Sequence, residues 1–106
     1  MITITAIIRV RAGAADAMLD ALAEVADYVR SEEPTTVGFF VSRDLETPCI
    51  FTTYERFIDR AAMDLHNSSE TVARFFAKAT PLLEGPVVLH SCEELIAVAR
   101  QETNSR

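Results

Sequence analysis

Two strand-like runs joined by a short polar loop constrain the fold of this chain most strongly. Residues 37–43 (VGFFVSR) and 49–57 (CIFTTYERF) are rich in aromatic and β-branched side chains, and Asp44–Pro48 between them has the residues of a hairpin turn. A helix-like run begins at Asp59, a typical N-cap residue, and extends to about His66. The pattern predicts a β-hairpin in the middle of a sheet, with a helix that folds back over it.

The segments on either side of this hairpin complete the fold. Residues 1–11 alternate between apolar and polar side chains, as a strand does, and residues 14–31 repeat apolar side chains at helical spacing. Asn67 and Glu70 resemble a capping box that restarts a helix, and a last strand is expected at residues 87–94. The order β-α-β-β-α-β predicts an α+β, ferredoxin-like fold, in which a four-stranded antiparallel sheet carries the helices on one face.

Length and charge limit the organisation and the partners of the chain. We predict one domain, residues 1–95, and a C-terminal arm, residues 96–106, whose apolar start is expected to dock on a partner and whose end is expected to fray. The net charge of −6 and the scattered basic residues argue against nucleic acid and anionic membranes as partners. No apolar run approaches the roughly 20 residues of a membrane span, and no signal-peptide pattern is present, so we expect a cytoplasmic protein.

Apolar side chains lie on both faces of the predicted strands. Phe39 and Phe40 are neighbours and therefore point in opposite directions, as do Ile50 and Phe51. Helices on one face leave the other face bare, where each apolar side chain loses about 1.5–3 kcal/mol relative to full burial. We predict a homodimer in which two sheets face each other; the alternative is a surface on which these groups are scattered among threonines.

Several kinds of site are missing from the sequence. The three glycines are isolated, so there is no phosphate-binding loop, and nothing indicates a flavin or nicotinamide cofactor. The two histidines lie far apart and there is no H-E-x-x-H motif, so no metal site is predicted. Cys49 and Cys92 are expected on the two strands that flank the first strand, beyond disulfide reach, and are interpreted as small buried hydrophobic residues.

The side chain best suited to chemistry is His66, at the end of the helix after the hairpin. About seven helical residues rise about 10 Å, which matches roughly three strand residues, so His66 should lie over Thr53 to Glu55. Glu55 shares one strand face with Phe51, Thr53 and Phe57. A histidine beside a carboxylate can remove a proton near neutral pH, which makes this pair the candidate catalytic centre.

Simpler interpretations of the same residues remain open at this point. His66 could merely end its helix, where a positive charge is favourable. Glu55 could pair with Arg56 or Arg9 in solvent. His90, on the last strand, is interpreted mainly as an ordinary sheet residue.

Three groups of residues form a recognisable pattern. They are Glu32, Pro34, Thr36, Gly38 and Phe39; Arg43 and Asp44, followed by Tyr54 to Phe57, Asp59, Ala62 and His66; and the run PLLEGP from Pro81 to Pro86. With these motifs, which span most of residues 2–95, the chain resembles the antibiotic biosynthesis monooxygenase (ABM) family of dimeric α+β barrels.

The resemblance implies a homodimer with a cleft between the sheet and the helices of each protomer. Some members are cofactor-independent oxygenases of anthrone- or quinol-like aromatics, in which the deprotonated substrate itself supplies electrons to dioxygen in an apolar pocket. His66 matches the family's helix-end histidine and Glu55 its strand glutamate, so these two are the expected catalytic residues. The family often has Trp in place of Phe57. The expected substrate-binding residues are Phe51, Thr53, Phe57, Phe75 and Phe76.

The haem-degrading branch of the family is distinguishable from this chain. It has Trp in place of His66, a haem-ligating His in place of Phe76 and Asn near Ile8, and all three are missing here. We therefore expect a cofactor-independent monooxygenase of a small aromatic substrate. The alternatives are an isomerase of a small oxygenated metabolite that uses the same two residues, and a dimeric ligand-binding or stress-related protein without turnover. Converging Arg or Lys side chains would indicate an anionic substrate, and an aromatic cleft an aromatic one.

Overall fold

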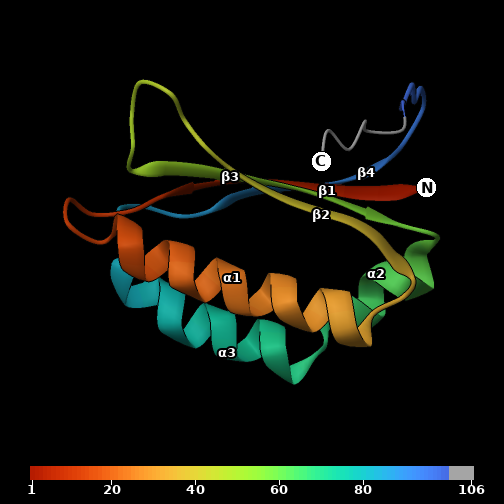
Figure 1. Cartoon of the computed structure of the whole chain (residues 1–106), viewed down its shortest axis with the longest axis horizontal. Helices are drawn as coiled ribbons and strands as arrows, with labels where there is room; N and C mark the ends of the chain where they lie inside the picture. Colours follow the sequence, from red (N-terminus) through yellow and green to blue (C-terminus); the bar gives the residue numbers. More distant parts are fainter. Residues whose placement is uncertain (101–106) are drawn as a thin grey trace, which may run out of the picture.

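The computed structural model of the protein, described for residues 1–100, is a four-stranded sheet with three helices packed on one side (Figure 1). The predicted β-α-β-β-α-β order with a broken second helix is confirmed, and element boundaries lie within two residues of those expected. The elements are β1 (Ile2–Arg9), α1 (Ala15–Glu32), β2 (Thr36–Arg43), β3 (Ile50–Phe57), α2 (Arg60–Asn67), α3 (Glu70–Ala79), the short 3-10 helix η1 (Thr80–Leu82) and β4 (Val88–Glu93).

The strands follow the order β2-β3-β1-β4, and each neighbouring pair is antiparallel. Ile4 lies opposite Glu55 and Ile8 opposite Phe51, so these side chains share one face of the sheet. All four are buried, as are Thr53 and Phe57 on the same face of β3. Alternation alone left open which face of β3 meets the helices, and the structure shows that it is the face of Phe51, Thr53, Glu55 and Phe57.

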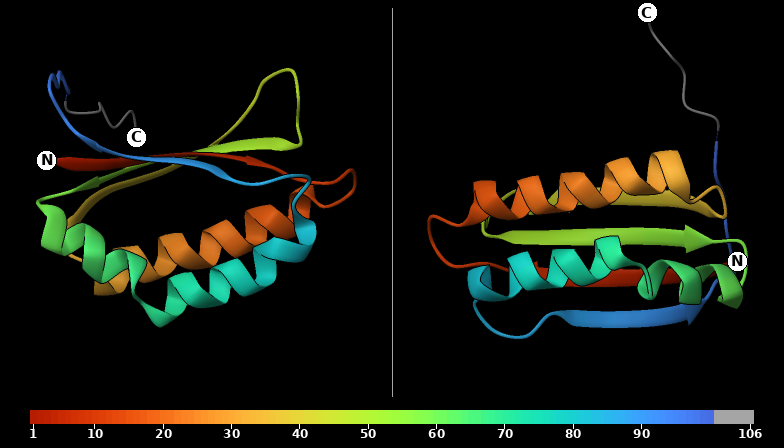
Figure 2. Two further views of the ribbon diagram at one scale, coloured as in Figure 1. Left: turned by 180° about the vertical axis from the view of Figure 1, so that it is seen from behind. Right: turned by 90° about the horizontal axis from the view of Figure 1, so that it is seen from below.

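The helices cover this face in two parts. α1 and α3 lie side by side across it, and α2 closes the end at which β3 leaves the sheet (Figure 2). α1 ends at Glu32 because Pro34 disfavours helical geometry at the residue before it. The next residue, Glu33, is buried at this turn although it is charged, which brings a carboxylate to the inner face of the fold.

Side-chain caps fix the starts of the two shorter helices. The Asp59 carboxylate accepts a hydrogen bond from the backbone N–H of Ala62 at 2.8 Å, as predicted. The predicted capping role of Asn67 is wrong, because α2 continues through this residue. Ser69 caps α3 instead, and its hydroxyl accepts from the N–H of Val72 at 3.2 Å.

Removal of the Asp59 cap should weaken the fold without changing its core. The Asp59→Ala variant is expected to lose about 1 kcal/mol of unfolding free energy, because an orphan N–H of α2 loses its acceptor. Urea unfolding followed by circular dichroism measures this loss. Asp64→Ala, on the exposed side of the same helix, is the matched control, and an equal loss in both variants would contradict the capping role.

The second face of the sheet carries no helix, and we call it the open face (Figure 1). Pairing places Ile7 opposite Val88 and Phe40 opposite Tyr54 on this face. Between 40% and 54% of the surface of each of these four residues is exposed. The predicted second apolar face therefore exists, and within residues 1–100 it lacks a helical cover.

The start of the C-terminal arm is tied to the open face. Arg56 and Glu94 form an ion pair at 2.8 Å, and the Tyr54 hydroxyl donates to the same carboxylate at 3.1 Å. The hydrogen bond from Arg56 holds the pKa of Glu94 below its usual range. Beyond Glu94, the apolar side chains Leu95, Ile96 and Val98 are largely exposed. The predicted frayed end falls on residues 101–106, outside the described part of the chain.

The helices of residues 1–100 are too short or too polar to cross a lipid bilayer.

Candidate active site

A pocket opens between the sheet and the helices, at the place where the packed core divides in two. One cluster of buried side chains contains Phe51 and Ile8, and the other contains Phe57 and Ile4. Ala6 stands between Ile4 and Ile8 on the inner face of β1, and its small side chain leaves space there. The pocket holds about 520 Å³, counting its open mouth, and is lined by Ile4, Ala6, Ile8, Leu22, Val25, Phe39, Thr53, Glu55, His66, Asn67, Val72, Phe75, Phe76, Val87 and Leu89.

His66 reaches this pocket from the last turn of α2 and is only 4% exposed. Its Nδ1 atom lies 2.8 Å from Oε1 of Glu33, and its Nε2 atom lies 3.2 Å from Oε1 of Glu55. The prediction that His66 lies over Thr53 to Glu55 is thus confirmed. The alternative pairing of Glu55 with Arg56 or Arg9 is wrong, because Arg56 binds Glu94 on the other side of the sheet.

Two threonine hydroxyls complete the polar cluster around the imidazole. Thr36 donates to Oε1 of Glu33 and Thr53 donates to Oε2 of Glu55, both at 2.8 Å. The second oxygen of Glu33, Oε2, is buried and has no hydrogen-bond partner among the described residues. Burial of a carboxylate oxygen without a hydrogen bond lowers the stability of the fold. The position of Glu33 beside His66 is therefore kept at a cost in folding free energy.

Burial and hydrogen bonding act on His66 in opposite directions. Burial lowers the pKa of the imidazole, but the hydrogen bonds with Glu55 and Glu33 outweigh it and hold the pKa of His66 above its ordinary value. Because the protonated ring has an N–H at both nitrogens, it can donate to both carboxylates at once. The cluster therefore favours an imidazolium between two glutamates.

This arrangement determines which group can take a proton from a ligand. Both ring nitrogens of His66 face carboxylates, so the imidazolium has no free lone pair toward the pocket. Glu55 lines the pocket, whereas Glu33 does not. Glu55 and His66 both line the pocket, and of the two only the Glu55 carboxylate has a free lone pair to offer a ligand.

The structure brings most, but not all, of the predicted site residues to the pocket. Thr53, Glu55, His66, Phe75 and Phe76 line it. Phe51 and Phe57 share the predicted strand face, but their rings are 1% and 0% exposed and belong to the two halves of the core. Phe57 contacts the site only through the His66 ring, at a centroid distance of 5.3 Å.

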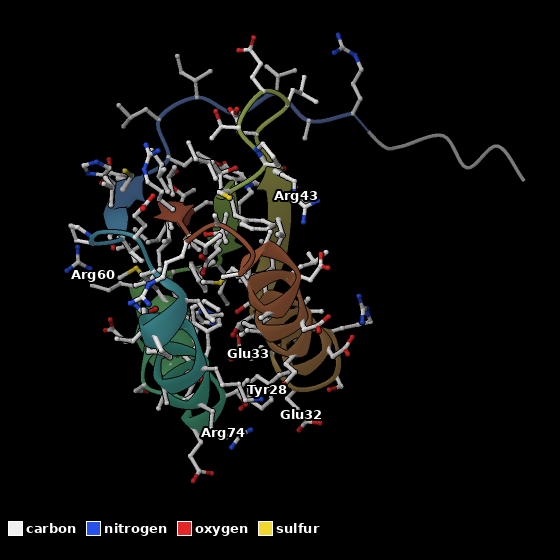
Figure 3. All side chains as sticks on the ribbon, turned by 90° about the vertical axis from the view of Figure 1, so that its left-hand side faces the viewer. Tyr28, Glu32, Glu33, Arg43, Arg60 and Arg74 are labelled. Carbon is white, nitrogen blue, oxygen red and sulfur yellow. The ribbon has the colours of Figure 1, made fainter. Side chains whose placement is uncertain are left out.

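Glu33 and Phe39 are among the site residues that sequence analysis missed. The family motif drew attention to Glu32, which is exposed, whereas the neighbouring Glu33 points inward between α1 and α3 (Figure 3). Glu33 lies one residue beyond the helix, where helical periodicity no longer predicts direction. The one available signal was the pair Glu33 and Thr36, which the turn at Pro34 brings within hydrogen-bond distance.

Other candidate groups lie away from the pocket. His90 is exposed on the open face, as expected for an ordinary sheet residue. Both cysteines are free, but the prediction that they are buried is wrong, because Cys49 is half-buried and Cys92 is exposed. Within residues 1–100, no group of three or more His, Cys, Asp or Glu side chains is arranged to hold a metal ion.

The fold and the site together define a class of protein: a small α+β domain with a mainly apolar pocket and a buried cluster of one histidine and two glutamates. The sequence model of the family "antibiotic biosynthesis monooxygenase" matches residues 1–78 of the 106. The chain therefore belongs to the ABM family. No curated protein sequence matches it.

Solved structures share this fold at low sequence identity. A crystal structure of an antibiotic biosynthesis monooxygenase is 22% identical, with a TM-score of 0.82 over 91% of this chain and 100% of the other. Rv0793 from Mycobacterium tuberculosis is 20% identical, with a TM-score of 0.85 over 92% and 98%. PA3566 from Pseudomonas aeruginosa is 24% identical, with a TM-score of 0.79 over 90% and 94%. These similarities confirm the ferredoxin-like α+β fold.

Proposed function

We propose that this protein is a cofactor-independent monooxygenase of a small, uncharged aromatic substrate, such as a quinol or an anthrone. The single observation that supports this most is the position of the Glu55–His66 pair at the wall of a mainly apolar pocket. A base in such a place can deprotonate a phenol or an activated carbon and leave the anion away from water.

The pocket wall supports an aromatic ligand and argues against an anionic one. Phe39, Phe75 and Phe76 contribute rings, and the half-exposed Phe76 stands at the rim. Among the lining residues within the described chain, none is Lys or Arg, the usual partners of phosphate and carboxylate groups. An isomerase that acts on an anionic oxygenated metabolite is therefore the weaker candidate.

The proposed reaction balances without a further reductant. With an anthrone, Glu55 takes a proton from the activated CH₂ group, and the resulting carbanion passes electrons to dioxygen. The carbon loses both hydrogens and becomes a carbonyl, one oxygen atom enters the product, and the other leaves as water. The four electrons that dioxygen accepts all come from the substrate carbon.

We also propose that two copies pair through the open face. Ile7, Phe40, Tyr54 and Val88 form an apolar surface across all four strands, and apolar surfaces of this kind mark protein interfaces. The exposed apolar start of the arm lies above the same face, where residues 96–99 border a hollow with Phe40 and Tyr54. We place the protein in the cytoplasm, a reducing compartment in which free cysteines such as these are usual.

Oxygen uptake with a panel of quinols and anthrones tests the proposed activity. The wild type should consume oxygen with at least one of them, and His66→Ala should lower kcat by about 10²-fold, because without the imidazolium the buried Glu55 carboxylate is no longer held ionised and in place. Ala6→Leu provides a second variant, because a larger side chain at this position fills the pocket and leaves the proton-transfer cluster intact. It should raise KM or abolish binding.

Three results would contradict this function. If no compound of the panel causes oxygen uptake, or if uptake is unchanged in His66→Ala, the proposed monooxygenase activity is contradicted. A product of the same mass as the substrate, formed without oxygen, identifies an isomerase. Binding of an aromatic ligand that Ala6→Leu abolishes, without any turnover, identifies a ligand-binding protein.

A further inference from the structure

We propose that Glu33 is a positioning residue of this site: it fixes the His66 ring through Nδ1 and supplies the second negative charge that makes Glu55 an effective base. This inference deepens the proposed function and rests on it for its catalytic meaning. Its structural part, the control of His66 by Glu33, is testable without any substrate.

The geometry carries the positioning role. Glu33 Oε1 lies 2.8 Å from His66 Nδ1, closer than Glu55 lies to Nε2, and both side chains are at least nine-tenths buried. Thr36 donates to the same oxygen, which orients the carboxylate. The contact thereby links the turn after α1 to the last turn of α2, two segments that are 33 residues apart in the sequence. Rotation of the imidazole about its χ2 bond would break both of its hydrogen bonds.

The burial of Glu33 costs folding free energy, and its contact with His66 must offset that cost. Its Oε2 atom is buried without a hydrogen-bond partner in residues 1–100. The preceding residue, Glu32, is also a glutamate, but it is exposed to solvent (Figure 3). The interaction with His66 is the feature of the fold that offsets this cost.

The charges of the cluster explain why a second carboxylate matters. An imidazolium between two carboxylates carries a net charge of −1, and a proton taken up by Glu55 neutralises the cluster. Without Glu33, and with the ring still protonated, the resting pair would be neutral, and the same proton would create a net positive charge in a mainly apolar pocket, which is unfavourable. Glu33 therefore strengthens Glu55 as a proton acceptor although it does not line the pocket.

Titration of the histidine ring by ¹⁵N NMR tests the inference. The charged groups that face His66 are Glu33 and Glu55, so Glu33→Gln removes one of two acceptors while burial still disfavours the imidazolium. The titration midpoint of His66 should lie above about 6.5 in the wild type and fall by about 1–3 pH units in Glu33→Gln. The exposed His90 gives reference signals in the same spectra.

Two further variants separate positioning from a general loss of structure. Glu32→Gln removes the same charge from the exposed neighbouring residue and should leave the His66 titration in place. Glu33→Asp retains the charge and should give a midpoint between those of the wild type and Glu33→Gln. In oxygen uptake, Glu33→Gln should lower kcat with KM unchanged and move the acidic limb of the pH profile to lower pH.

The pH dependence of the unfolding free energy gives an independent test of the contact between Glu33 and His66. A raised pKa in the folded state contributes stability that is complete below the unfolded pKa, about 6.5, and is lost as the pH rises through the folded value. The stability difference between the wild type and Glu33→Gln should therefore be larger at pH 5.5 than at pH 8.5.

Defined outcomes overturn the inference. A wild-type midpoint at or below about 6.5 would do so without any variant, and so would a folded Glu33→Gln variant with an unmoved His66 titration. If the midpoint falls as expected but no substrate of the panel is oxidised, the control of His66 by Glu33 stands and the proposed function fails.

Discussion

Glu55→Gln is expected to lower kcat for oxygen uptake by about 10²–10⁴-fold, the usual contribution of a positioned acid or base. The amide retains the size of the side chain and can still accept from Thr53, but it cannot take a proton from the substrate. KM should change little, because Glu55 is one polar group in a pocket whose wall is mainly apolar. Steady-state oxygen consumption at several pH values measures both constants.

The comparison with His66→Ala identifies the proton acceptor. If Glu55 contacts the substrate and His66 acts through it, Glu55→Gln should be the more damaging substitution. The opposite order would assign the acceptor role to His66. Glu93→Gln, on the exposed edge strand β4, is the control for a lost carboxylate outside the pocket and should retain full activity.

Phe40→Asp is expected to dissociate the proposed homodimer. Loss of a buried Phe side chain costs about 1.5–3 kcal/mol, and a two-fold interface suffers it twice, so the dimer should weaken by about 3–6 kcal/mol. This corresponds to a dissociation constant about 10²–10⁴-fold higher. Analytical ultracentrifugation across a concentration series measures the change in the dissociation constant. Light scattering gives the molecular mass at the lowest and highest concentrations.

The hairpin loop supplies a matched control for this variant. Leu45 is fully exposed at the tip of the loop between β2 and β3, so Leu45→Asp introduces the same charge away from the sheet. It should leave the association unchanged. A wild-type chain that remains single at high micromolar concentration, or a Phe40→Asp variant that associates as tightly as the wild type, would remove the proposed interface.

The fold was predictable because its signals are local. Alternation in residues 1–11 and the hairpin of residues 37–57 indicated strands, and helical spacing indicated the packed side of α1. The same alternation placed Thr53 and Glu55 on one face of β3, and the structure shows that this is the inner face. A comparison of helix rise with strand rise was then sufficient to bring His66 above them.

The depth and the edges of the pocket were not predictable in the same way. Alternation gives the face on which Phe51 and Phe57 lie, but the pocket opens only where the covering side chains leave space. Met18 packs with Phe51, and Met63 packs with Phe57, so both rings are enclosed. The gap beside Ala6 depends on three elements at once, and no single segment of the sequence specifies it.

The division of the site between different elements has a consequence for how such proteins diversify. The ionisable groups of the site come from β3 and the ends of α1 and α2, whereas α3, β4 and the residue before that strand contribute Phe75, Phe76, Val87 and Leu89. Substitutions in this second set can reshape the chamber for a new molecule while the ionisable trio stays untouched. A fold of this kind can change the substrate that it binds while the ionisable groups stay the same.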